Sequence, residues 1–127
     1  MRKRTILPCA AFTLFLLVPL AGAQSTHAFL WTQAGGMQDL GALPNWQDSG
    51  ALAISKSGQV VGSLVNPANG DRAGFAWSAK KGMHVLKGLS TKQSVAFGIN
   101  TSLQIVGGAY TTGTIEHAFL WTPTGGM

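Results

Sequence analysis

The side chains best suited to acid–base or metal chemistry in this chain are its three histidines. His27 and His117 each open a His-Ala-Phe-Leu-Trp-Thr segment, whereas His84 stands outside such a segment. Two equivalent histidines could form a metal or proton site. Ala73 occupies the same position in a third, related segment, so a ring of such ligands would be interrupted there. We therefore expect His27 and His117 to be scaffold residues whose side chains hydrogen-bond to a neighbouring loop.

The carboxylates show no arrangement typical of hydrolysis. They are Asp39, Asp48, Asp71 and Glu116, and no two share a repeat position, although the last two precede an aromatic segment by similar distances. Paired carboxylates in glycosidases must lie close together, whereas a repeat would space these residues one unit apart. Segment 69–71 is too short for a calcium loop, and the motifs of serine hydrolases, zinc proteases and phosphate loops are absent. The sequence indicates no enzyme, cofactor or metal site; a hydrolase or lyase on a propeller scaffold is the alternative.

One aromatic side chain stands apart from any repeat. Trp46 lies in the polar loop 44–48, and the matching stretch 90–93 contains no aromatic residue. A single aromatic side chain in a polar loop is the best candidate for a binding residue. We expect Trp46, together with Asn45 and Asp48, to contact a ligand, either a glycan or a surface protein.

These residues are organised by an internal repeat of about 45 residues. The tryptophans of the His-Ala-Phe segments, Trp31, Trp77 and Trp121, are 46 and 44 residues apart. Each is followed by a Gly-Met pair, and the element from 51 to 62 recurs from 96 to 107. The sequence therefore divides into two repeats, 27–72 and 73–116, and a partial repeat, 117–127.

Each repeat has the pattern of short β-strands. Aromatic and small residues alternate before a Gly-Gly turn, and further strands are expected over 37–43, 51–55 and 59–65. The fold class is all-β, built from short antiparallel four-stranded units like propeller blades, with a β-solenoid or an open meander as alternatives. The repeated aromatic residues are expected to form the packing between units; they are Phe29, Trp31, Phe75, Trp77, Phe119 and Trp121.

Two repeats and a short third one cannot close a ring of four to eight blades. The sequence is therefore expected either to be a fragment of a longer product or to associate with other copies through an open strand edge.

The first 23 residues have the pattern of a secretory signal. Arg2, Lys3 and Arg4 precede an apolar run that ends in Ala-Gly-Ala, which predicts cleavage between Ala23 and Gln24. An uncleaved membrane anchor is the alternative. After cleavage, 24–127 keeps six basic and four acidic residues, a net charge of +2, and loses the only cysteine. We expect no nucleic-acid partner, no disulfide and no stable membrane span.

The ordered elements also resemble the HAF repeat, which is found in predicted extracellular bacterial proteins. The family pattern falls on 27–31, 35–37, 39–41, 51–55 and 58–62, and the resemblance covers 27–127. It implies secretion, or a place in the cell envelope or periplasm, and it implies no known reaction. The departures from the pattern are Ala73 for His, Ala76 for Leu, and Leu103 for the turn glycine. Leu103 predicts a strained hairpin or a different turn type.

Overall fold

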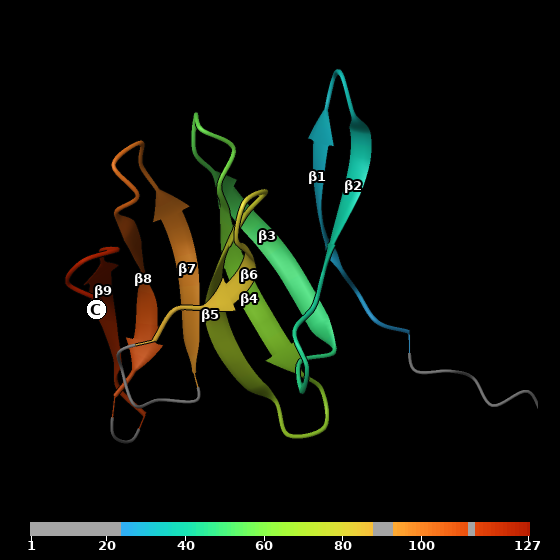
Figure 1. Ribbon diagram of the computed structural model, residues 1–127. Helices are drawn as coiled ribbons and strands as arrows, with labels where there is room; N and C mark the ends of the chain where they lie inside the picture. The colour runs from blue at the N-terminus through green and yellow to red at the C-terminus, as the bar shows by residue number, and fades with distance from the viewer. Residues whose placement is uncertain (1–23, 88–92, 112–113) are drawn as a thin grey trace, which may run out of the picture.

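The computed structural model describes residues 24–87, 93–111 and 114–127. The predicted signal, which ends at Ala23, lies outside these ranges. Residues 88–92 also lie outside them, and with them most of the loop 90–93 that matches the Trp46 loop. Within them, nine strands form three small antiparallel sheets, with no helix and no closed barrel (Figure 1). The all-β prediction is confirmed.

The three sheets follow one another along the chain. Sheet A contains β1 (Ala28–Thr32) and β2 (Gly36–Gly41). Sheet B contains β3 (Asp48–Ile54), β4 (Val60–Asn66), β5 (Asp71–Ser78) and β6 (Gly82–Val85). Sheet C contains β7 (Ser94–Ile99), β8 (Ile105–Tyr110) and β9 (Glu116–Trp121). In each sheet, strands adjacent in sequence are paired, which is also the strand order of a propeller blade.

The sheets are offset from the sequence repeats by half a unit. The repeat 27–72 was expected to fold as one four-stranded unit, but its first two strands form sheet A and its next two begin sheet B. The aromatic segment of the second repeat then supplies β5 and β6 of sheet B. A sequence repeat has no intrinsic starting point, so its period shows the unit length but not which strands pair.

A hydroxyl side chain and a glycine form the turn after each aromatic strand. The side-chain oxygens of Thr32, Ser78 and Thr122 accept hydrogen bonds from the backbone N–H three residues later, at 3.0, 3.2 and 3.0 Å. The glycine four residues after each hydroxyl residue has a φ of 67 to 71°. Because this left-handed conformation favours glycine, the Gly-Met pair recurs with the tryptophans.

A β-bulge in the first strand of sheets B and C explains another repeated glycine. Leu52 and Phe97 are the extra residues in β3 and β7, where the pairing register shifts. Opposite them, a Cβ on Gly62 would lie 1.9 Å from the carbonyl oxygen of Gly50. A Cβ on Gly107 would lie equally close to backbone, so only glycine fits beside each bulge.

The core consists of two layers between neighbouring sheets. Between sheets A and B, Phe75 and Trp77 pack with Ala28 and Leu40. Between sheets B and C, Phe119 packs with Val61 and Ala76 of sheet B and with Leu86, which directly follows β6. In both layers, the aromatic side of one sheet covers the aliphatic side of the sheet before it. Aromatic side chains make the largest apolar contribution per residue to such a layer.

The repeated aromatics, which were expected to pack between units, differ in burial. Phe75, Trp77 and Phe119 are at most 7% exposed, and Trp121 is partly buried against the second core layer. Phe29 and Trp31 are 55% and 61% exposed. They occupy the same position in sheet A as Phe75 and Trp77 in sheet B, but no sheet of the described chain covers their side of sheet A.

A buried serine links each sheet to the next. The Ser49 hydroxyl, at the start of sheet B, accepts a hydrogen bond from the Ala28 N–H of sheet A at 2.9 Å. The Ser94 hydroxyl, at the start of sheet C, accepts one from the Gly74 N–H of sheet B, also at 2.9 Å. The two bonds are equivalent by the repeat. Each satisfies a buried backbone donor that would otherwise cost free energy on folding.

The turn at Leu103 has the same hydrogen bonds as its counterpart at Gly58. In both turns the backbone carbonyl three residues before Gly58 or Leu103 accepts a hydrogen bond from the N–H of that residue, at 3.0 and 3.1 Å. Gly58 has a φ of 82° and Leu103 one of 63°. The sequence left open a strained hairpin or another turn type. The turn is unchanged, and Leu103 adopts a conformation that is unfavourable for a residue with a Cβ.

Replacing Gly58 with Ala is expected to lower the free energy of unfolding by about 1 kcal/mol, because a Cβ at this φ is strained although the space around it is open. Urea denaturation measures the change. Gly50→Ala is the matched control, since it too adds a methyl group in open space but without a positive φ. Equal effects of the two substitutions would contradict the prediction.

Replacing Ser94 with Ala is expected to lower the free energy of unfolding by about 2 kcal/mol, because the Gly74 N–H is left buried without a partner. Thermal and urea denaturation test this expectation. Ser102→Ala, in an exposed turn, is the control and should change stability by less than about 0.5 kcal/mol. A Ser94→Ala protein as stable as this control would show that the bond contributes nothing.

Candidate functional site

Trp46, the binding residue predicted from the sequence, lies on the wall of an open cavity of about 510 Å³. The other lining residues are Ser25, His27, Gly41, Ala42 and Gln47. The Trp46 side chain is only partly exposed, because its ring also packs against the core layer between sheets A and B. This tryptophan therefore has a structural role in addition to any contact with a ligand.

The two residues predicted to act with Trp46 do not line this cavity. Asn45 occupies a turn and has a φ of 70°, a conformation that asparagine tolerates better than most residues. The Asp48 carboxylate accepts a hydrogen bond from the Thr26 N–H at 2.7 Å, and the Ser49 N–H donates to the Thr26 carbonyl at 2.8 Å. Asp48 therefore holds the segment before β1 against sheet B. The structure brings only Trp46 to the cavity.

His27 pairs with a carboxylate. Its Nδ1 lies 2.9 Å from Oδ2 of Asp39 on β2, so the predicted scaffold role holds, with a strand rather than a loop as partner. The hydrogen bond with His27, and then one donated by the Gly41 N–H, lower the pKa of Asp39. Ala73 and Val85 occupy the same two positions in sheet B. The pair is thus replaced as a unit where that side of the sheet is covered.

The second His-Ala-Phe histidine, His117, lies exposed on β9, and no hydrogen bond to it is found among the described residues. The four carboxylates have separate surroundings: Asp71, for example, accepts a hydrogen bond from the Asn69 side chain at 2.9 Å. Within 24–87, 93–111 and 114–127, no group of three or more His, Cys, Asp or Glu residues could hold a metal ion.

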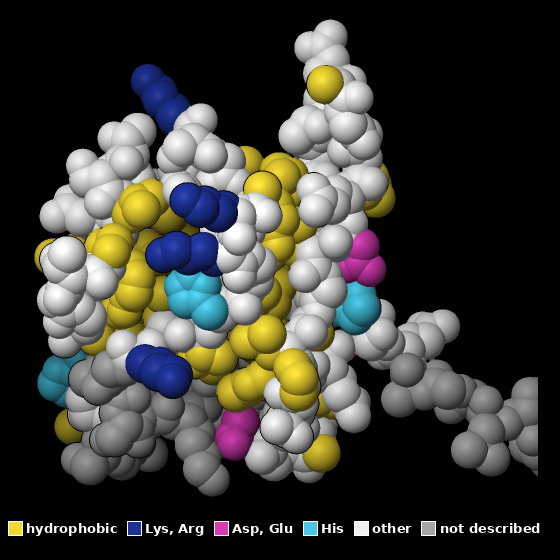
Figure 2. All heavy atoms as spheres, viewed as in Figure 1, with side chains coloured by type: hydrophobic (Ala, Val, Ile, Leu, Met, Phe, Trp, Pro, Cys, Tyr) yellow, Lys and Arg dark blue, Asp and Glu magenta, His cyan; other side chains and the backbone are white. Residues whose placement is uncertain are grey.

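A basic and apolar groove of about 330 Å³ lies between sheets B and C. Trp77, Trp121 and Ile105 are among its apolar lining residues, and Lys81 and His84 are among its polar ones. Burial, and secondarily the charge of Lys81, lower the pKa of His84, so its ring is neutral at neutral pH. Figure 2 shows basic side chains around apolar ones on this side of the molecule.

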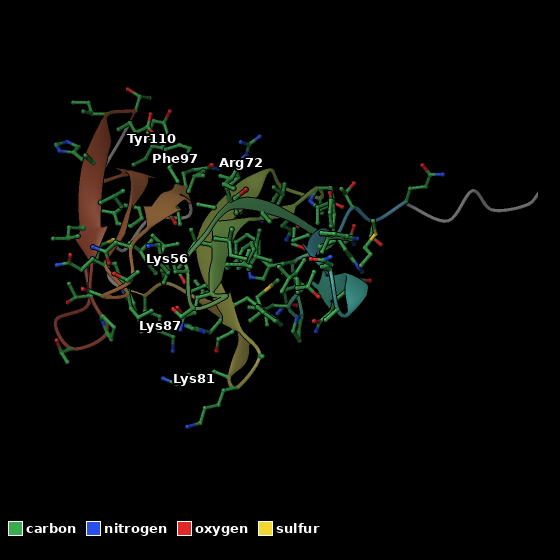
Figure 3. All side chains as sticks on the ribbon, turned by 90° about the horizontal axis from the view of Figure 1, so that it is seen from above. Lys56, Arg72, Lys81, Lys87, Phe97 and Tyr110 are labelled. Carbon is green, nitrogen blue, oxygen red and sulfur yellow. The ribbon has the colours of Figure 1, made fainter. Side chains whose placement is uncertain are left out.

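The third cavity, of about 500 Å³, is a groove at the edge where sheets B and C meet, and the sequence did not reveal it. We call it the edge groove. Phe97, Tyr110 and Arg72 lie along it, on the side of the molecule away from Lys81 and Lys87 (Figure 3). Among the described residues its lining consists of Leu52, Ser63, Arg72, Gln93, Ser94, Val95, Phe97, Gly108, Tyr110 and Glu116.

Both bulges contribute to this groove. Leu52 and Phe97, the extra residues of β3 and β7, are 52% and 55% exposed, and both line it. The side chains of Arg72, Tyr110 and Glu116 form no hydrogen bond or ion pair with the described residues. The groove thus combines exposed aromatic surface with a guanidinium, a phenol and a carboxylate that are available to a ligand.

Searches against protein-family models, curated proteins and solved structures find no match for this chain. Among the described residues there is no helix of the length and hydrophobicity that a membrane crossing requires.

Replacing Trp46 with Ala is expected to lower the free energy of unfolding by about 2 kcal/mol, roughly half the usual cost for a fully buried tryptophan, because part of its ring packs on the core. Urea denaturation followed by circular dichroism measures the loss. Trp31→Ala, at a tryptophan that is 61% exposed, is the matched control and should cost clearly less. Equal losses would show that Trp46 has no special packing role.

Proposed function

We propose that this chain is an exported β-repeat module that binds a neutral oligosaccharide in the edge groove and catalyses no reaction. The observation that carries the proposal is the composition of that groove. It presents the exposed rings of Phe97 and Tyr110 beside the guanidinium of Arg72 and the carboxylate of Glu116, which have no partner among the described residues.

The charge of the edge groove favours a neutral ligand. Among the described residues that line it, Arg72 is the only cation and Glu116 the only anion. Lys81 and Lys87 lie on the other side of the molecule (Figure 3). Sugars have apolar C–H faces that can pack on aromatic rings, and hydroxyl groups that can hydrogen-bond to charged and phenolic side chains. A neutral oligosaccharide uses both kinds of surface.

The export part of the proposal rests on residues 1–23, whose charge and hydropathy pattern is that of a secretory signal. The resemblance to the HAF repeat supports the same destination, outside the cell or in its envelope. A surface glycan would be within reach of a protein at either location.

The proposal is tested by calorimetric titration with a panel of neutral oligosaccharides of glucose, mannose and N-acetylglucosamine. Phe97→Ala and Tyr110→Ala are each expected to weaken binding about tenfold, because each removes one stacking surface. Phe29→Ala is the matched control, since Phe29 is as exposed as Phe97 but lies on sheet A. It should bind like the wild type.

The same titration with Trp46→Ala distinguishes the two cavities. Loss of binding in that variant, with Phe97→Ala unaffected, would place the ligand in the Trp46 cavity and refute the edge groove. If no member of the panel binds, the proposal that the ligand is a neutral oligosaccharide is overturned. Shorter sugars detected by mass spectrometry after incubation would favour the alternative, a hydrolase or lyase.

A further inference from the structure

The outer face of sheet A is an apolar surface that the described chain leaves uncovered. Phe29, Trp31 and Met37 point to this side and are 55%, 61% and 70% exposed. Their counterparts in sheet B are Phe75, Trp77 and Met83, and two of these are almost fully buried. Aromatic and methionine side chains on one exposed face mark an interaction surface.

The opposite end of the molecule presents the matching surface. Val106 and Leu120 on the outer face of sheet C are 50% and 52% exposed. Their counterparts in sheet B are Val61 and Ala76, which are buried under the aromatic side of sheet C. Leu120 also corresponds to Leu30 of sheet A, which packs against the core beneath sheet B. The Leu120 position receives an aromatic face in both internal interfaces, and the Val106 position does so between sheets B and C.

We propose that the outer face of sheet A docks onto the outer face of sheet C of a second copy. The contact would repeat between chains the packing that sheets A and B, and sheets B and C, make within the chain. The occupant is a second copy because the chain itself carries both halves of an interface that it forms twice internally. The two surfaces differ, so the association is head-to-tail.

Two features make this contact reversible. The hydrogen-bonded pair of His27 and Asp39 lies on the same side of sheet A as Phe29 and forms a polar margin beside the apolar residues. Within the residues that the structure describes, sheet A also has no strand equivalent to β3 or β7, so the contact between copies lacks a counterpart of the Ser49 and Ser94 hydrogen bonds. We therefore expect association that depends on concentration.

The test uses two variants of the full-length protein, each blocked on one face, and sedimentation velocity. Trp31→Asp blocks the outer face of sheet A, and Leu120→Asp blocks that of sheet C. Each variant alone should self-associate at least about tenfold more weakly than the wild type, because association would bury the introduced carboxylate without a partner. An equimolar mixture should form a one-to-one dimer and nothing larger, since one intact face of each kind remains.

Ile115→Asp, at an exposed apolar residue before β9, is the control and should associate like the wild type. Circular dichroism checks that the variants are folded; Trp31→Gln and Leu120→Gln replace any that is not. Dimers of Leu120→Asp alone would show a symmetric contact between sheet A faces and refute the head-to-tail proposal. A wild type that stays monomeric at every concentration would also overturn it and assign these faces to another segment or partner.

Discussion

The structure depends on covering the aromatic sides of sheets B and C, each with the sheet before it. None of the three sheets described exceeds four strands, and a sheet of two strands, such as sheet A, is at best marginally stable alone in water. A chain with a single cysteine can form no internal disulfide to compensate. The burial of Phe75, Trp77 and Phe119 between sheets therefore supplies stabilisation that no sheet supplies for itself. The hydrogen bonds of Ser49 and Ser94 fix how far one sheet slides along the next.

The sequence was sufficient to predict the strands and their turns, because these depend on local patterns. The alternation around Phe29 and Trp31 predicted the strand correctly, and the recurring glycines predicted the turns correctly. The pairing of strands into sheets was not predictable, since a periodic sequence fits any choice of starting strand. Ser49 and Ser94 were missed because their neighbours differ, Asp-Ser-Gly in one repeat and Gln-Ser-Val in the other. Only the fold shows that both hydroxyls reach the preceding sheet.

The candidate sites show the same limit. Trp46 stood out because it is not repeated, and it does line a cavity, but its ring also packs on the core. The edge groove is assembled from residues of both sheet B and sheet C, including Arg72 and Tyr110, which are far apart in sequence and belong to no motif. Whether a side of a sheet is covered also explains why two residues differ together between sheets A and B. His27 and Asp39 stand where the sheet is open, whereas Ala73 and Val85 stand at the same positions beneath another sheet.

The half-unit offset between sequence repeats and sheets has a consequence for how such a protein changes in length. A duplicated segment of one repeat would begin with the last two strands of one sheet and end with the first two of the next. When such a segment is inserted between two existing repeats, its first two strands would complete the sheet that the preceding repeat begins. Its last two strands would begin a sheet that the following repeat completes. Gain or loss of a whole repeat therefore adds or removes one sheet without leaving an unpaired hairpin. Because each repeat contributes strands to two sheets, it also connects adjoining sheets covalently. Unequal recombination within the gene would thus yield foldable products of different lengths.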